Sequence, residues 1–171
     1  MDEEKLNRLP PDVKKQFVKL ALKLSEKKTK TKVNDDFLTF VKHVWPEFIE
    51  GKHHKEIAEK FNQIARGEIK RLIINMPPRH TKSEFASFLL PSWMVGRKPD
   101  LKIIQTTHTT ELAIRFGRKA KTLMDSQEYK QVFKTRLRED SQAAGKWETE
   151  QGGEYYAAGV GSAITGRGAD L

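Results

Sequence analysis

Lys82 and Ser83 lie between an apolar run and an amphipathic segment, in the stretch INMPPRHTKSE. Phosphate-binding loops need inward-pointing backbone N–H groups, a lysine that reaches the outer phosphates and a hydroxyl for magnesium. Lys82 and Ser83 have the residue types and the order for the last two roles. The strict pattern of such loops also requires glycine at the positions of Met76 and Thr81, and neither is glycine. The pattern alone therefore does not identify a phosphate site.

The charges around this stretch favour an anionic ligand. Arg79, His80 and Lys82 crowd the start of a predicted helix, where the helix dipole is positive and each added cation costs about 0.3–1 kcal/mol. A bound polyphosphate would reverse that cost, and the Arg79 guanidinium can hold phosphate oxygens in a bidentate way. The alternative interpretation is a basic surface turn without a ligand.

Length and composition indicate one globular domain with a polar surface. The chain has 171 residues, of which 37% are hydrophobic and 32% are charged. This is enough to bury one core, with room for a helical appendage. The absence of cysteine excludes disulfides, thiolate zinc sites and a cysteine nucleophile.

The net charge of +9 makes nucleic acid a plausible partner, because basic surfaces attract polyanions. Residues 1–33 hold ten Lys or Arg against five Asp or Glu, and include the run EKKTKTK at 26–32. We interpret 1–33 as a basic helix followed by a linker, which either is simply solvated or forms a contact surface. No apolar run is long enough to span a bilayer and no signal peptide is evident, so we expect a soluble intracellular protein without a membrane partner.

Helical spacing of apolar residues predicts three helices in the first half. One follows Pro10-Pro11 and reaches the lysine-rich run. A second follows the capping residues 34–36 and stops at Trp45-Pro46, and a third covers about 52–66 and closes at Gly67.

The pattern then changes to alternating strands and helices. Short apolar runs at 71–75 and 101–107 predict buried strands, each followed by a helix, over 83–95 and 110–124. This order predicts an α/β fold whose sheet is mainly parallel and flanked by helices. Beyond Ser126, paired glycines at 152–153 predict a hairpin of two further strands.

The whole set of motifs resembles the ATPase part of phage large terminases, the motors that package DNA. MPPRHTKSE is similar to that family's phosphate loop. The segments GEIKRLIINMPPRHTKSE, WMVGRKPDLKIIQTTHTTELAIRFGRKAK and GGEYYAAGVGSAITGRGADL stand in the family's order. The match covers about 67–171, with a weaker extension back to about residue 40. The resemblance implies a P-loop ATPase domain over 34–171, truncated before the Walker B acids.

The resemblance also assigns roles to individual residues. It implies that the ATP phosphates are held by the loop, that Lys82 and Arg79 act in catalysis and that the Ser83 hydroxyl binds Mg²⁺. The implied nucleotide contacts in the loop are Pro78, Arg79, His80, Thr81, Lys82 and Ser83.

Two further sites carry alternatives. Trp45, His53 and His54 resemble the family's adenine-side segment, although the tryptophan could equally pack at a helix interface, and no third ligand is spaced for zinc. Arg167, between two glycines, is similar to arginines offered in trans to a neighbouring subunit's ATP. A loop arginine that contacts DNA phosphate is the competing interpretation.

The resemblance places the magnesium-holding and water-positioning acids beyond Asp170-Leu171, so we expect little or no ATP hydrolysis by this chain alone. The implied partners are double-stranded DNA, a homo-oligomeric ring, the portal protein and the small terminase subunit, in the host cytoplasm. Two alternatives remain: a helicase-like P-loop ATPase from another branch, and a non-enzymatic DNA-binding or assembly module.

Overall fold

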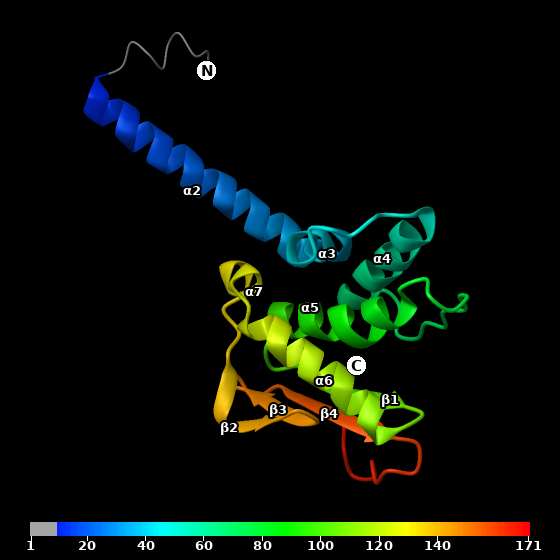
Figure 1. The fold of residues 1–171 in the computed structure, drawn as a ribbon. Helices are drawn as coiled ribbons and strands as arrows, with labels where there is room; N and C mark the ends of the chain where they lie inside the picture. Colours follow the sequence, from blue (N-terminus) through cyan, green and yellow to red (C-terminus); the bar gives the residue numbers. More distant parts are fainter. Residues whose placement is uncertain (1–9) are drawn as a thin grey trace.

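The computed structural model describes residues 10–171 of the chain (Figure 1). The described part consists of helices, several of which pack around an aromatic core, and of a small sheet that lies beside them. The helices are α2 Pro11–Asp35, α3 Phe37–Val44, α4 Lys52–Ala65, the π-helical turn η1 Glu84–Leu89, α5 Leu90–Arg97, α6 Thr110–Asp125 and α7 Gln127–Val132. The strands are β1 Lys102–Thr107, β2 Leu137–Ala143, β3 Lys146–Thr149 and β4 Glu154–Gly159.

The fold is α/β, with a four-stranded mixed sheet in the order β1-β4-β3-β2. Only β1 and β4 are parallel, because β4–β3 and β3–β2 are antiparallel pairs. Helix α6 packs on β1 and β4 and lies across the sheet in Figure 1. The expected hairpin is confirmed as β3 and β4, but the expectation of a mainly parallel sheet is wrong, since this hairpin and β2 supply three of the four strands.

Residues 71–75, expected to form a buried strand, are extended together with Met76 but are not part of the sheet. Their burial alternates as in a strand, with Leu72, Ile74 and Met76 half-buried and Ile73 86% exposed. Among the described residues, no backbone hydrogen bond joins 71–75 to a neighbouring strand. The backbone is therefore extended as expected, but the predicted buried strand does not form, because pairing needs a partner.

Helix α2 is longer than predicted, because it continues through the lysine-rich run 26–32 to Asp35. Lysine and glutamate are good helix formers. The hydroxyls of Thr29 and Thr31 donate to the carbonyls of Ser25 and Lys27, four residues earlier, so they are satisfied inside the helix. The N-terminal part of α2 projects away from the remaining structure (Figure 1), and the run 26–32, predicted as a linker, is helical. Residues 1–9 lie outside the described part.

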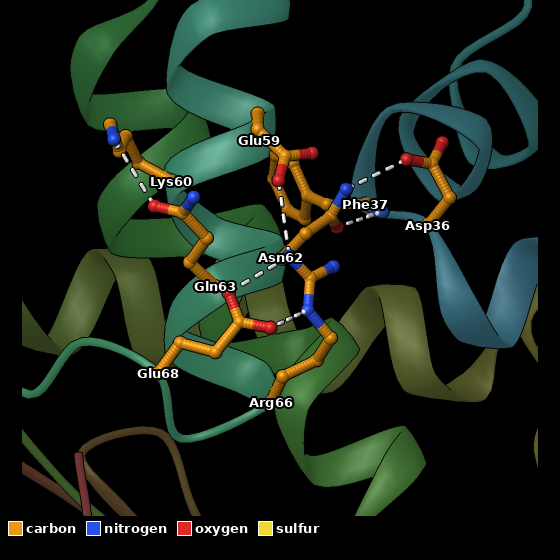
Figure 2. Close-up of polar contacts among 8 residues, drawn as sticks. All are labelled: Asp36, Phe37, Glu59, Lys60, Asn62, Gln63, Arg66 and Glu68. Carbon is orange, nitrogen blue, oxygen red and sulfur yellow. Dashed lines mark hydrogen bonds and ion pairs between the residues drawn. The ribbon is translucent and has the colours of Figure 1, made fainter.

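The start of α3, which packs on α4, confirms the predicted cap. The Asp36 carboxylate accepts from the Thr39 N–H at 2.7 Å. Asn62 on α4 donates to Asp36 at 2.8 Å and accepts from the buried N–H of Phe37 at 2.8 Å (Figure 2). Burial would raise the pKa of Asp36, but the hydrogen bonds from Thr39 and Asn62 outweigh it and hold that pKa below its ordinary value.

An aromatic cluster forms the centre of the helical part. Phe37 meets Phe61, Phe85 and Trp93 edge-on at 5.0–5.4 Å between ring centroids. The Trp93 indole N–H donates to the carbonyl of Val33 at 3.0 Å, which ties the end of α2 to α5. These buried rings fix the helices on which the loop 77–83 is mounted. No helix among residues 10–171 is both long and apolar enough to cross a membrane.

Candidate phosphate-binding loop

The stretch INMPPRHTKSE forms a loop between the extended segment 71–76 and a helix that begins at Lys82. Residues 77–84 line a hollow of about 320 Å³ at the helix start. The N–H of Phe85 donates to the carbonyl of Thr81 at 2.9 Å, so helical bonding begins directly after the loop. No side chain caps this helix. Unpaired N–H groups at a helix start form an anion site when cations accompany them.

Two loop residues hold backbone angles that glycine adopts easily. Arg79 has φ 63° and Thr81 has φ 59°. Thr81 is at the position where the strict phosphate-loop pattern requires glycine, and its φ supplies a physical reason for that requirement. The threonine adopts the left-handed conformation despite its branched Cβ, which costs on the order of 1–3 kcal/mol.

The loop cations lie around this hollow. Arg79 and His80 are exposed, as is the hydroxyl-bearing Ser83. The Lys82 ammonium donates to the carbonyl of Met76 at 3.3 Å, across the loop from its own backbone. His80 Nδ1 donates to the carbonyl of Pro78 at 2.9 Å, which fixes the turn that follows the prolines.

The one carboxylate that lines the hollow is neutralised from another helix. Both oxygens of Glu84 accept from the Lys119 ammonium of α6, at 2.6 and 2.7 Å. This ion pair joins the start of the loop helix to α6. Because Lys119 neutralises Glu84, this carboxylate cancels little of the positive charge around the hollow.

His54 binds the loop directly. Its Nδ1 accepts from the N–H of Gly51 at 2.9 Å, so in the neutral ring Nε2 carries the proton and donates to the Thr81 hydroxyl at 2.6 Å. The ring is 6% exposed, and lies against Phe48 and Phe85. Burial, and then the charge of His53, lower the pKa of His54, while Glu50 opposes them. Neutral His54 therefore fits the site.

The three residues expected on the adenine side occupy different places. His54 is buried and uses both nitrogens within the protein. Trp45 is half-buried, packs on Phe48 at 5.4 Å and lines a separate groove with Glu84 and Lys119. His53 is one of the residues that line a groove of about 760 Å³ between α4 and residues 72–76. Its Nε2 is buried and has no hydrogen-bond partner among the described residues.

Arg167 is held on the sheet rather than extended into solution. Its guanidinium donates to Glu154 at 2.6 Å and lies over the Tyr156 ring at 3.9 Å, both on β4. Residues 10–171 contain no group of three His, Cys, Asp or Glu side chains that could hold a metal by themselves.

Sequence reasoning named both His54 and Thr81 but missed the bond between them. The two residues are separated by 27 positions, and only the packing of α4 on η1 brings them together. Comparison of the chain with protein-family models, with curated proteins and with solved structures found no match.

Proposed function

We propose that the loop 77–83 binds the phosphates of ATP or ADP with magnesium. The observation that carries this proposal is the hollow at an uncapped helix start, bordered by Arg79 and Lys82 and shaped by two residues with positive φ. Its volume of about 320 Å³ suits a di- or triphosphate rather than a whole nucleotide. The resemblance of the loop and its neighbours to large terminases supports the same ligand.

Each side chain has a distinct role in this proposal. Lys82 turns from the Met76 carbonyl to the outer phosphates, and Arg79 grips phosphate oxygens from the opposite rim. Helix N–H groups that no side chain caps donate to the same oxygens. Ser83 offers its hydroxyl to magnesium, which neutralises phosphate charge when bound. The base extends into the neighbouring groove that His53 lines.

We further propose that this nucleotide site belongs to a terminase-type P-loop ATPase, in which ATP hydrolysis drives double-stranded DNA into a procapsid. In that assembly, subunits form a ring, and portal protein and small subunit are its partners. Arg167 would leave Glu154 and Tyr156 to reach a neighbouring subunit's nucleotide, because an arginine in trans stabilises the charge that develops during phosphoryl transfer.

Titration of a fluorescent ADP analogue with magnesium tests the proposal. Binding is measured rather than hydrolysis, because the one carboxylate lining the hollow is held by Lys119. We expect saturable binding by the native chain and at least a tenfold loss in Lys82→Ala, on the order of one charge-assisted contact. Lys134→Ala, which removes an exposed lysine elsewhere, is the matched control and should bind normally.

Absence of binding by the native chain, with the fold intact by circular dichroism, would refute the nucleotide site. Equal losses in Lys82→Ala and Lys134→Ala would reduce the interaction to general charge attraction. Competition by ADP but not by adenosine would place the affinity in the phosphates, as the loop geometry requires.

A second candidate function rests on α2. Its lysines lie on an exposed, projecting helix that also leaves Leu20 and Leu24 more than half exposed. Such a surface suits a non-enzymatic DNA-binding or assembly module. Salt-dependent binding of duplex DNA that Lys82→Ala leaves unchanged, and that replacing Lys19, Lys23 and Lys27 by alanine removes, would favour this candidate if nucleotide binding fails.

A further inference from the structure

Three hydrogen bonds in series connect the start of α4 to the backbone of the loop. The Gly51 N–H donates to His54 Nδ1, His54 Nε2 donates to the Thr81 hydroxyl, and that hydroxyl donates to the carbonyl of His80 at 2.7 Å. Each donor in the series has one acceptor, so the direction of every proton is fixed. The series requires neutral His54 with its proton on Nε2.

The last bond of the series acts at the residue with the least favourable backbone. Thr81 holds φ 59°, a conformation that a β-branched side chain rarely adopts. Its hydroxyl is gripped from both sides, by His54 and by the His80 carbonyl. Such fixed contacts are what allow a strained residue to persist.

We propose that His54 is a positioning residue, which holds Thr81 in the conformation that glycine would otherwise supply and thereby keeps the loop shaped for phosphate. The inference rests on the proposed function for its ligand, but the hydrogen-bond series stands without it. Threonine at position 81 and histidine at position 54 form one unit. His54 itself does not contact the nucleotide.

The unit is sensitive to acid. A protonated His54 has no lone pair on Nδ1, so the Gly51 N–H loses its acceptor and the ring must move. The titratable groups facing His54 are His53, with ring centroids 3.8 Å apart, together with His80 and Glu50. Both histidines oppose the charging of His54 and only Glu50 favours it. Acid therefore releases Thr81 and disorders the phosphate hollow.

A double-mutant cycle tests the proposal, with the fluorescent ADP analogue and magnesium as probe. His54→Ala should weaken binding about tenfold in the native background and less than about twofold in a Thr81→Gly background, because glycine needs no side-chain restraint. His54→Gln, whose amide N–H can still donate to Thr81, should keep native affinity at pH 7. It should also lose the decline in affinity that the native chain shows at acid pH.

Limited trypsin digestion measures the same loop without any nucleotide. His54→Ala should speed cleavage after Arg79, and His54→Gln should not. Equal affinity losses in both backgrounds would overturn the proposal, since His54 would then contact the nucleotide or support the fold generally. Unchanged cleavage would overturn it even where nothing binds nucleotide. If His54→Ala is cleaved faster and His54→Gln is not, but no protein binds the nucleotide, the proposed function would be rejected and the role of His54 would stand.

Discussion

Two turns in this chain lead from an extended segment into a helix, and they end in opposite ways. The turn from β1 into α6 caps itself: Thr109 accepts from the Leu112 N–H at 3.2 Å, and the Thr107 hydroxyl donates to the Thr109 carbonyl at 2.6 Å. Glu111 complements the helix dipole. The loop 77–83 has neither a side-chain cap nor a free acid at the same point.

The difference is between a helix start that a side chain caps and one that no side chain caps. In the β1–α6 turn, the Thr109 hydroxyl accepts from the Leu112 N–H of the first helical turn, and Gly159 of β4 packs directly on Thr110. In the loop, the N–H groups and the cations of Arg79 and Lys82 are left together, beside a hollow. The shared order of extended segment, turn and helix therefore says little about function until the partners of the first helical turn are known.

Ligand-linked stability should separate the turns most strongly. Magnesium ADP at a hundred times its dissociation constant should stabilise the native chain by about 2.7 kcal/mol, as any ligand specific to the folded state does. Thr109→Ala should gain the same increment from the ligand, whereas Arg79→Ala should gain much less at the same concentration. Thermal unfolding with and without ligand measures both. A reduced increment in Thr109→Ala would show that the two turns are not independent.

A side chain added in the β1–α6 turn should lower the free energy of unfolding by nearly as much as the ligand raises it. A Cβ on Gly159 would lie 2.3 Å from the backbone nitrogen of Thr110, so Gly159→Ala should destabilise the chain by about 1–3 kcal/mol. Urea denaturation measures this loss. Gly168→Ala is the matched control, because a Cβ there meets nothing within 4 Å. Similar stabilities of the two variants would mean that the turn can shift to accommodate a Cβ at position 159.

Removing the hydroxyl at the start of each helix should give a smaller difference in stability between the two turns. Thr109→Ala should cost about 1 kcal/mol of unfolding free energy, which is the usual value of a threonine N-cap. Ser83→Ala should cost nothing measurable without ligand, because its hydroxyl caps no helix N–H. Ser83→Ala should instead raise the magnesium concentration needed for nucleotide binding. A stability loss in Ser83→Ala equal to that in Thr109→Ala would remove the distinction drawn here.

Mild acid should give the smallest change in the free energy of unfolding, and the lowered pKa of His54 determines the sign of that change. The pKa of His54 is lowered in the folded chain, so below about pH 6.5 the unfolded chain binds the extra proton first. Stability should therefore fall as pH decreases from 7 towards the folded-state pKa of His54, and stay level above 7. Urea titrations at several pH values should show a shallower fall in His54→Gln. An equally steep fall would assign the effect to other groups.

The locally encoded features were predictable from the sequence. Asp36 caps α3, Gly67 ends α4 with φ 76°, and the paired glycines 152–153 connect β3 to β4. Each depends on residues within a few positions of one another. The loop's residue types were equally visible, because Lys82 and Ser83 are adjacent.

Long-range features were not predictable in the same way. The segment 71–76 has the alternation of a strand, but sheet membership depends on a distant partner. Strand β2 was missed because its sequence LREDSQA is polar and gives no apolar pattern. The bond between His54 and Thr81, and the pair between Glu84 and Lys119, arise only from tertiary packing.

The unpaired segment 71–76 also affects how the chain behaves in concentrated solution. Asp170 and Leu171 already pair with Lys102 and Ile104 of β1, while no described residue pairs with the backbone of 71–75. A row of free backbone groups with Ile73 86% exposed is a template for adding another chain's strand. Self-association of this chain should therefore begin at the segment 71–75. Replacing Ile73 by lysine should oppose it, because a charge interrupts the apolar run.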